Sequence, residues 1–374
     1  MGQLPRTGGD RLRRYREKVT SSTPASARAT AFALPSSAGA RQRALAVLAI
    51  LGLAVLIAFI IACATGSVAI PPTELLSALL APARSDASLT STLLHLRLAR
   101  AASAFVTGAS LALAGVMMQA LLRNPLADPY VLGVSGGAAV GALGAMLLAS
   151  TAWIIDVSAF CGALLVAMLL FWLARRDLQG GAGNSHGADQ SHLLLSGIVV
   201  ASGCGALVTL MLSVAPDARL RGMVFWLIGD LSGTSLRPVP WVVICAALLF
   251  ASCSARAINL MAMHAEAATA LGVSVGRLRR GLFFCAALLT AAAVSNAGSI
   301  GFVGLIVPHA CRFALGPDHR LLLPAATLVG GAFLLLADTL ARTVVAPQQL
   351  PVGVITALVG VPLFLLQLHQ LRKR

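Results

Sequence analysis

The stretch ALAVLAILGLAVLIAFIIACA, residues 44–64, runs for 21 residues without a charged side chain. About 20 apolar residues are needed for a helix to cross a bilayer, whereas the apolar part of a signal peptide has about 7–15. We therefore interpret 44–64 as a membrane span. The whole chain agrees, because 58% of its 374 residues are apolar, 11% are charged, and the mean hydropathy is +0.86. Soluble domains are about a quarter charged, so the composition excludes a soluble enzyme and predicts an all-α polytopic membrane protein.

Further apolar segments follow on the C-terminal side of this span. With it they give ten candidate transmembrane helices: 44–64, 101–121, 128–150, 152–173, 193–214, 239–255, 281–296, 299–315, 322–340 and 351–369. Another apolar stretch, Met223 to Leu231, is too short to cross and is interpreted as a half-helix at the membrane surface or a re-entrant segment. Ten spans place both termini on one side of the membrane.

The net charge of +15 tests that count. Such basicity is typical of nucleic-acid binding, but it also arises when Lys and Arg collect in cytoplasmic loops. With ten alternating spans, 21 of the 28 basic residues fall on the side of the N-terminus and 7 on the other. This bias favours cytoplasmic termini and a lipid bilayer, not nucleic acid, as the partner. Residues 1–42 are expected to be a basic, disordered cytoplasmic tail, and 43–374 the membrane domain.

The sequence offers no catalytic, metal or cofactor site of its own. It contains no GxxxxGK[ST] phosphate loop, and its two lysines, Lys18 and Lys373, follow no glycine-rich turn. The seven cysteines include no CxxC pair and lie mostly in apolar runs. If the chain takes part in ATP-driven transport, the ATPase must be another polypeptide.

Three arginines stand out on the predicted outer side. Arg97 and Arg100 share one helical face in HLRLAR, and Arg342 precedes the last span. They are either arginines that extend toward the membrane surface or a docking surface for an acidic partner, because guanidinium groups bind carboxylates at two points. Asp338 lies four residues before Arg342, which favours a local ion pair.

Two segments stand out on the predicted inner side. Pro125 and Pro129 bar a helix through residues 123–129, so this connection is a fixed turn and either a simple link or a constriction of a pathway. In 261–276, Met263 to Leu271 should be helical and end at Gly272. We favour a protein-binding helix there over a linker.

Glycines four residues apart mark the third span. Gly133, Gly137 and Gly141 allow close helix packing. Packing within one subunit is favoured over a subunit interface.

Five segments of the chain resemble a known family. They are RNPLADPYVLGVSGGAAVGAL (123–143), LRGMVFWLIGDLSG (220–233), GSIGFVGLIVPHACRFALGPDHRLLLPAA (298–326), ADTLARTVVAP (337–347) and LPVGVITALVGVPLF (350–364). From about residue 43 onward the chain is similar to the FecCD family, the permease subunits of type II ABC importers for iron-siderophores, haem and vitamin B12. The resemblance implies about ten transmembrane helices, a homodimer with the pathway on its two-fold axis, and a place in the bacterial inner membrane. It also implies two copies of a cytoplasmic ABC ATPase subunit and a periplasmic substrate-binding protein as partners.

The resemblance also implies roles for particular residues. Arg97, Arg100 and Arg342 match arginines that meet glutamates of the binding protein, although Ala99 stands where many relatives carry Pro. Asn124 and Leu126 match residues of the cytoplasmic gate. The segment containing Glu266, Ala267 and Gly272 corresponds to the region that couples to the ATPase.

The pathway and the cargo are separate hypotheses. The small residues of the fifth span, Gly203 and Gly205 among them, suit the lining of a pathway. An iron chelate, siderophore or haem, is the favoured cargo, and cobalamin is the alternative. A secondary transporter that needs no ATPase is a more distant alternative, and the lack of a clustered catalytic set argues against a membrane-bound enzyme.

Overall fold

The computed structural model describes residues 37–66, 89–175, 188–234, 236–263 and 265–371. All regular structure within these ranges is helical, which confirms the predicted all-α class. The chain divides into two compact units, residues 1–45 and 46–374. The described part of the first unit is the beginning of helix α2, and the account below concerns the second.

The predicted spans occur as helices in the predicted order. They are α2 (Ser37–Ala64), α4 (Leu89–Leu121), α5 (Val134–Leu147), α6 (Ala152–Leu173), α8 (Ala188–Ser213), α10 (Pro238–Met263), α12 (Val275–Ala297), α13 (Val303–Leu315), α14 (His319–Thr343) and α15 (Val352–Leu371). Among the described residues, seven of these helices are long and apolar enough to cross a membrane, and α5, α13 and α15 are shorter apolar helices. The chain is therefore a multi-pass membrane protein.

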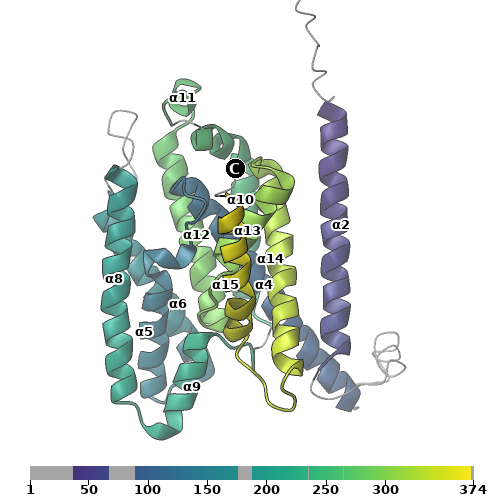
Figure 1. Cartoon of the computed structure of the whole chain (residues 1–374). Helices are drawn as coiled ribbons and strands as arrows, with labels where there is room; N and C mark the ends of the chain where they lie inside the picture. Colours follow the sequence, from purple (N-terminus) through teal and green to yellow (C-terminus); the bar gives the residue numbers. More distant parts are fainter. Residues whose placement is uncertain (1–36, 67–88, 176–187, 235, 264, 372–374) are drawn as a thin grey trace, which may run out of the picture. The chain divides into compact units, whose positions relative to one another are not determined.

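Three short elements complete the fold (Figure 1). The apolar stretch predicted at 223–231 lies in helix α9 (Asp217–Ile228) and the loop that follows it. The helix predicted at 263–271 is α11 (Ala265–Ala270). A 3₁₀ turn, η2 (Pro129–Leu132), precedes α5, so the span predicted to begin at 128 becomes a regular helix only at Val134.

The predicted N-terminal tail is only partly within the described residues. Helix α2 begins at Ser37, so residues 37–42, expected in the tail, are helical. Residues 1–36 lie outside the described part, and their disorder stays a prediction.

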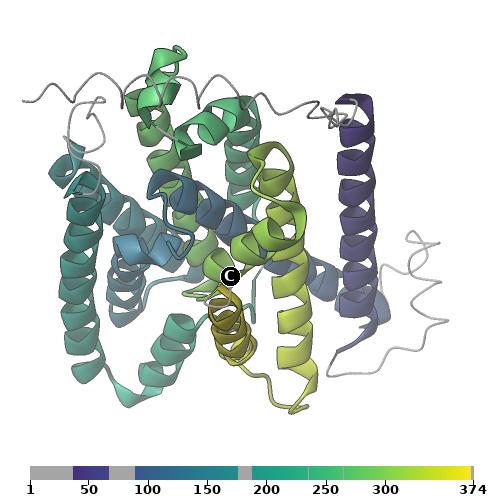
Figure 2. The ribbon, with the colours of Figure 1, turned by 45° about the horizontal axis from the view of Figure 1, so that its top comes forward.

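Helix α4 is the core of the second unit. Figures 1 and 2 show it crossing the bundle obliquely, and it packs against α10, α12, α13 and α14. Small residues make this packing close, because a side chain at Gly108 would overlap the carbonyl oxygen of Gly330, and one at Gly115 that of Gly304. Membrane helices have no hydrophobic drive to associate within lipid, so such backbone proximity supplies the dispersion contacts that hold them.

The glycines of α5 pack inside the subunit, as favoured from the sequence. A side chain at Gly137 would meet α6 at Gly162, and one at Gly141 would overlap the carbonyl oxygen of Ser158. Gly133 has a different role: its φ of +71° lets the chain turn from η2 into α5.

At each end of the bundle, polar contacts join segments that the sequence predicts to lie on the same side of the membrane. Helix α11 lies at the opposite end from α9 (Figure 1). At the α11 end, the Asn259 side chain donates to Asp318 at 2.7 Å, joining α10 to the start of α14. At the α9 end, Arg237 pairs with Asp156 at 2.5 Å, joining the start of α10 to α6. We call these the inner end and the outer end, respectively, following the charge bias, and the orientation itself stays a prediction.

Candidate functional site

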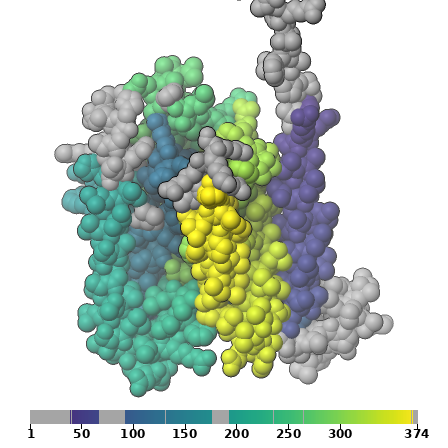
Figure 3. Space-filling model, viewed as in Figure 1, coloured from purple at the N-terminus to yellow at the C-terminus, as the bar shows by residue number. Residues whose placement is uncertain are grey.

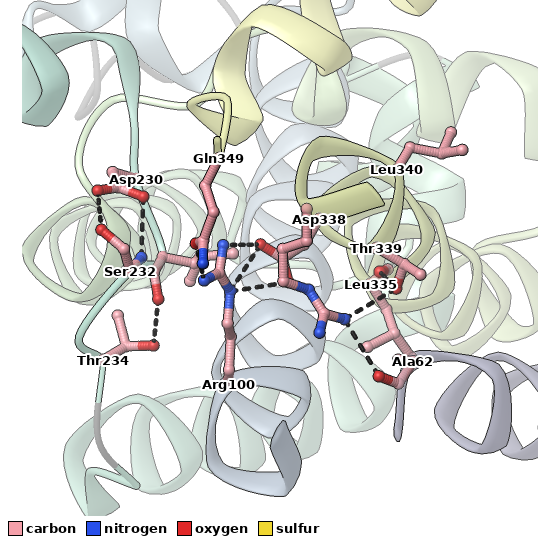
Figure 4. Close-up of polar contacts among 12 residues, drawn as sticks. Ala62, Arg100, Asp230, Ser232, Thr234, Leu335, Asp338, Thr339, Leu340 and Gln349 are labelled. Carbon is pink, nitrogen blue, oxygen red and sulfur yellow. Dashed lines mark hydrogen bonds and ion pairs between the residues drawn. The ribbon is translucent and has the colours of Figure 1, made fainter. Parts of the chain in front are cut away.

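A cluster of charged side chains lies at the outer end, where α4 meets α14. It consists of the charged residues Arg97, Arg100, Asp338 and Arg342 with the neutral amide of Gln349, and we call it the outer cluster. Figure 4 shows Arg100 between Asp338 and Gln349. Both arginines of α4 and the one of α14 that the sequence singled out belong to it. Helix geometry brings them together, since Arg97 and Arg100 are one turn apart and Asp338 and Arg342 are one turn apart.

Asp338 is the centre of the outer cluster. Its carboxylate is fully buried and accepts from Arg100 at 2.8, 3.0 and 3.1 Å, while Nε of Arg342 lies 3.1 Å away. The predicted local pair between Asp338 and Arg342 is therefore confirmed. The link to Arg100, 238 residues away, could not be read from spacing. Gln349 accepts from the same guanidinium at 2.7 Å.

Arg97 and Arg342 also bind the end of α2. Arg97 donates to the carbonyl oxygen of Cys63 at 2.9 Å, and Arg342 donates to that of Ala62 at 3.2 Å. Longer contacts reach Ala64 and Thr65 at 3.4 Å. Carbonyls in the last turn of a helix have no partner within the helix and carry its negative dipole end, so cations are stabilised there.

The predicted docking arginines therefore converge, but their charged groups are engaged inside the protein. Arg97 is 8% exposed and Arg342 5% exposed, and the Arg100 side chain is 12% exposed. Their role in contacting a binding protein is untested by these contacts and stays a prediction.

The predicted gate residues form a compact turn after α4. The side-chain oxygen of Asn124 accepts from the backbone N–H of Leu126 at 2.9 Å, and its carbonyl accepts from Ala127 at 3.1 Å. This is an Asx turn, which the two prolines make necessary because no helix passes through them. Asn124 is exposed and Leu126 is 40% exposed, so both side chains are available to a pathway.

Asp128 ends this turn and starts η2. Its carboxylate accepts from the Tyr130 N–H at 2.7 Å. Burial raises the pKa of the Asp128 carboxyl to about 6, although that hydrogen bond acts in the opposite direction.

Helix α11 presents an exposed surface at the inner end. Glu266 and Ala267 are exposed, Ala268 is buried beneath them, and Leu271 is 68% exposed. The helix stops as predicted at Gly272, whose φ is +83° and whose N–H donates to Thr269. Its coupling to an ATPase stays a prediction.

The predicted lining residues lie on an open face of α8. A side chain added at Gly203 or Gly205 would meet no atom within 4 Å. On the face shown in Figure 3 the surface is hollowed between α8 and α15. Near the outer end, a cavity of about 440 Å³ adjoins α9 and is lined by Met146, Ala218, Arg221, Gly222, Phe225, Trp226, Asp230 and Ser232.

The sequence patterns did not indicate one further feature: several chain breaks meet inside the bundle. We call residues 129–133, 229–230, 297–302 and 351–353 the broken-helix junction. The Tyr130 hydroxyl accepts from the N–H of Ile300 at 3.1 Å, and the N–H of Asp230 donates to Ala297 at 2.9 Å. The N–H of Gly353 donates to Gly229 at 3.4 Å.

The junction explains why two apolar helices, α5 and α13, are short. Helices α5 and α13 begin beside it, and a hydroxyl contact of 2.8 Å joins Ser135 to Ser299. A helix of 14 residues spans about 21 Å, less than the roughly 30 Å of a bilayer core. Non-helical backbone then lies at membrane depth, where it must find partners inside the protein. The signals in the sequence were a glycine at each break, together with Pro129 and Pro351 at two of them.

No group of three or more His, Cys, Asp or Glu side chains suited to a metal ion occurs within the part of the chain that the structure describes.

Comparison with known proteins identifies relatives over most of the chain. The model of the FecCD transport family matches residues 53–370. The cobalamin import system permease protein BtuC of Halobacterium salinarum is 46% identical over 275 residues, covering 72% of this chain and 71% of that protein. The hemin transport system permease protein HmuU of Yersinia pestis is 42% identical over 287 residues, covering 73% and 81%.

A solved structure shares the fold. It is an inward-facing metal-chelate type ABC transporter, which superposes with a TM-score of 0.73 at 28% identity and covers 87% of this chain and 99% of that one.

Proposed function

Because this chain belongs to the FecCD transport family, we propose that it is the permease subunit of an ABC importer that carries an iron chelate, a siderophore or haem, from periplasm to cytoplasm. The family match over residues 53–370 carries the proposal, since it includes nearly the whole membrane domain. The 42% identity to a hemin permease supports an iron chelate. The protein would lie in the bacterial inner membrane as a homodimer with cytoplasmic termini.

The energy comes from partner subunits in this proposal. The chain has no phosphate loop, and α11 offers an exposed surface on which Glu266, Ala267 and Gly272 contact one of two ATPase subunits. A periplasmic binding protein delivers the cargo at the outer end, near Arg97, Arg100 and Arg342.

Co-purification tests the coupling. We expect Leu271→Asp to release the ATPase from the complex, because a charge replaces an apolar side chain that is 68% exposed beside Gly272. Leu236→Asp is the matched control, since Leu236 is 62% exposed on the segment before α10 at the outer end. Uptake that persists without ATP would contradict the ABC mechanism and favour a secondary transporter.

The pathway is formed by the open face of α8 and closed at the inner end by Asn124 and Leu126. A wall of small, uncharged residues binds a large chelate weakly, so the cargo is not trapped. Specificity is then left to the binding protein.

A bulky substitution tests the lining. Gly203→Trp should abolish uptake while the complex still assembles, because a Cβ at this position meets no atom within 4 Å in its own subunit and the indole extends from an open helix face. Gly52→Trp on α2, which is equally free of neighbours within 4 Å, should leave uptake unchanged. Normal uptake by Gly203→Trp would remove α8 from the pathway.

Cobalamin is the second candidate cargo, favoured by the 46% identity to a cobalamin permease. Vesicles containing the full complex and its binding protein should accumulate only one of haem, a ferric siderophore and cobalamin. Accumulation of cobalamin alone would replace the iron-chelate proposal.

A further inference from the structure

Helix α2 has few contacts with the rest of the bundle. Only 6% of its most apolar window is buried. The buried side chains, Ala58, Ala62 and Cys63, lie in its last two turns, where Phe59 also contacts Phe105 of α4 at 5.7 Å between ring centres. The outer end of α2 is therefore its main point of attachment in this subunit.

Arginines from two other helices bind the backbone at that end. Arg97 of α4 and Arg342 of α14 donate to the carbonyls of Cys63 and Ala62, which precede the end of the helix at Ala64. A charged donor to a helix C-terminus combines a hydrogen bond with the favourable dipole interaction. Gly66 leaves room for it, because a side chain there would lie 2.7 Å from the Arg97 guanidinium.

Asp338 pairs with Arg342 on the side of the guanidinium away from α2. Its buried carboxylate lies 3.1 Å from Nε of Arg342, an ion pair by distance, while Nη2 of the same guanidinium donates to Ala62 of α2. Arg100 binds the same carboxylate but donates to no α2 carbonyl; its other partner is Gln349. The three arginines thus divide into two that reach α2 and one that does not.

We propose that Arg97 and Arg342 are positioning residues that clasp the outer end of α2 to α4 and α14, with Asp338 orienting Arg342. The clasp fixes where the chain leaves α2 on the outer side, beside the outer cluster. This role goes beyond the proposed import function and separates two of the three arginines from a purely partner-contacting role.

The reactivity of Cys63 reports on the clasp. Cys63 is 7% exposed, its own carbonyl accepts from Arg97, and the adjacent carbonyl of Ala62 accepts from Arg342. In the full-length chain, reconstituted in lipid nanodiscs, it is kept as the only cysteine by replacing the others with alanine or serine: Cys161, Cys204, Cys245, Cys253, Cys285 and Cys311. The rate of labelling by a membrane-impermeant maleimide is then measured.

Loss of the clasp should expose Cys63. We expect Arg97→Ala and Arg342→Ala to raise the labelling rate by about tenfold, because local opening becomes easier when a charged hydrogen bond is lost. Arg97→Lys should restore most of the protection, since it keeps a cationic donor. Arg100→Ala and Arg219→Ala are controls; Arg219 binds the end carbonyls of α5 instead, at 3.2 and 2.5 Å.

The controls also separate the clasp from general instability. Thermal unfolding is followed for each variant, and if Arg342→Ala does not fold, Arg97→Ala and Arg97→Lys decide the question alone. Unchanged labelling in folded Arg97→Ala would overturn the proposal. So would an equal rise in Arg97→Ala, Arg100→Ala and Arg219→Ala. Because the assay needs no ATPase or cargo, failure of the import proposal would leave this result unaffected.

Discussion

The outer cluster and the broken-helix junction hold the same bundle together by different means. In the outer cluster, side-chain charges join α4 and α14 through Asp338 and reach the end of α2 through Arg97 and Arg342. In the junction, backbone groups bind one another, and glycines such as Gly298 and Gly353 leave no room for a side chain. The stability of the outer cluster should therefore respond most to substitutions that remove a charge, and that of the junction to substitutions that add side-chain volume.

Removal of the Asp338 carboxylate should lower the unfolding free energy more than any other substitution considered below. Asp338→Ala leaves two nearly buried guanidiniums without their anion, and breaking a buried pair in this way costs about 3–5 kcal/mol. We expect a correspondingly large fall in the unfolding free energy, measured by thermal or denaturant unfolding in detergent.

The matched control is Asp156→Ala at the same end of the bundle. Its pair with Arg237 is partly exposed, with side chains 23% and 27% accessible, and such pairs contribute less than about 1 kcal/mol. If Asp338→Ala and Asp156→Ala lowered the unfolding free energy equally, burial would not make the ion pairs of the outer cluster stronger than a partly exposed pair.

One added methyl group should disturb the junction. In Gly353→Ala the new Cβ would overlap the carbonyl oxygen of Ile228, so α9 or α15 must move, at a cost of about 1–3 kcal/mol. The measurement is again the unfolding free energy. Gly203→Ala serves as control, because its Cβ meets no neighbour and alanine favours the helix. A Gly353→Ala protein as stable as wild type would contradict the tight junction.

The turn formed by residues 123–129 contains the titratable side chain of Asp128. Its contribution to the unfolding free energy should be smaller than that of Asp338 and should depend on pH. The pKa of Asp128 is raised to about 6, so the folded protein binds this proton more strongly than the unfolded chain does. The stability contributed by the protonated carboxyl is therefore lost as pH rises from about 4 through 6, by up to roughly 3 kcal/mol.

Asp128→Asn isolates this contribution, because the amide oxygen still accepts from Tyr130 but does not titrate. The difference in melting temperature between wild type and Asp128→Asn should change between pH 5 and pH 7.5, with wild type relatively weaker at the higher pH. A difference independent of pH would exclude Asp128 as the titrating group.

The helical order followed from sequence because each predicted span of the bundle contains a long apolar run. Runs such as 44–64 are long and uncharged, and close glycine spacing indicated how α5 packs. The Asp338–Arg342 pair was also predictable, since both residues lie on one helix. The link from Asp338 to Arg100 was not, because it depends on how α4 crosses α14.

The inward direction of Arg97 and Arg342, two of the three arginines predicted to contact a binding protein, was hidden for a related reason. Their partners are carbonyl oxygens of Ala62 and Cys63, and backbone groups are present at every position, so no residue type marks them. The junction was missed because each break, read alone, resembles an ordinary span boundary. Contacts between breaks, such as those of Tyr130 with Ile300 and Asp230 with Ala297, show that they meet.

Helix α9 is supported at both ends. Near its start, Arg219 binds the last carbonyls of α5, and just beyond its end the backbone of Gly229 accepts from Gly353 at the start of α15. It is thus a short rigid helix held at both ends by hydrogen bonds to neighbouring helices. A force on the outer surface of α9 is therefore expected to be shared between α5 and α15, which extend from α9 into the bundle.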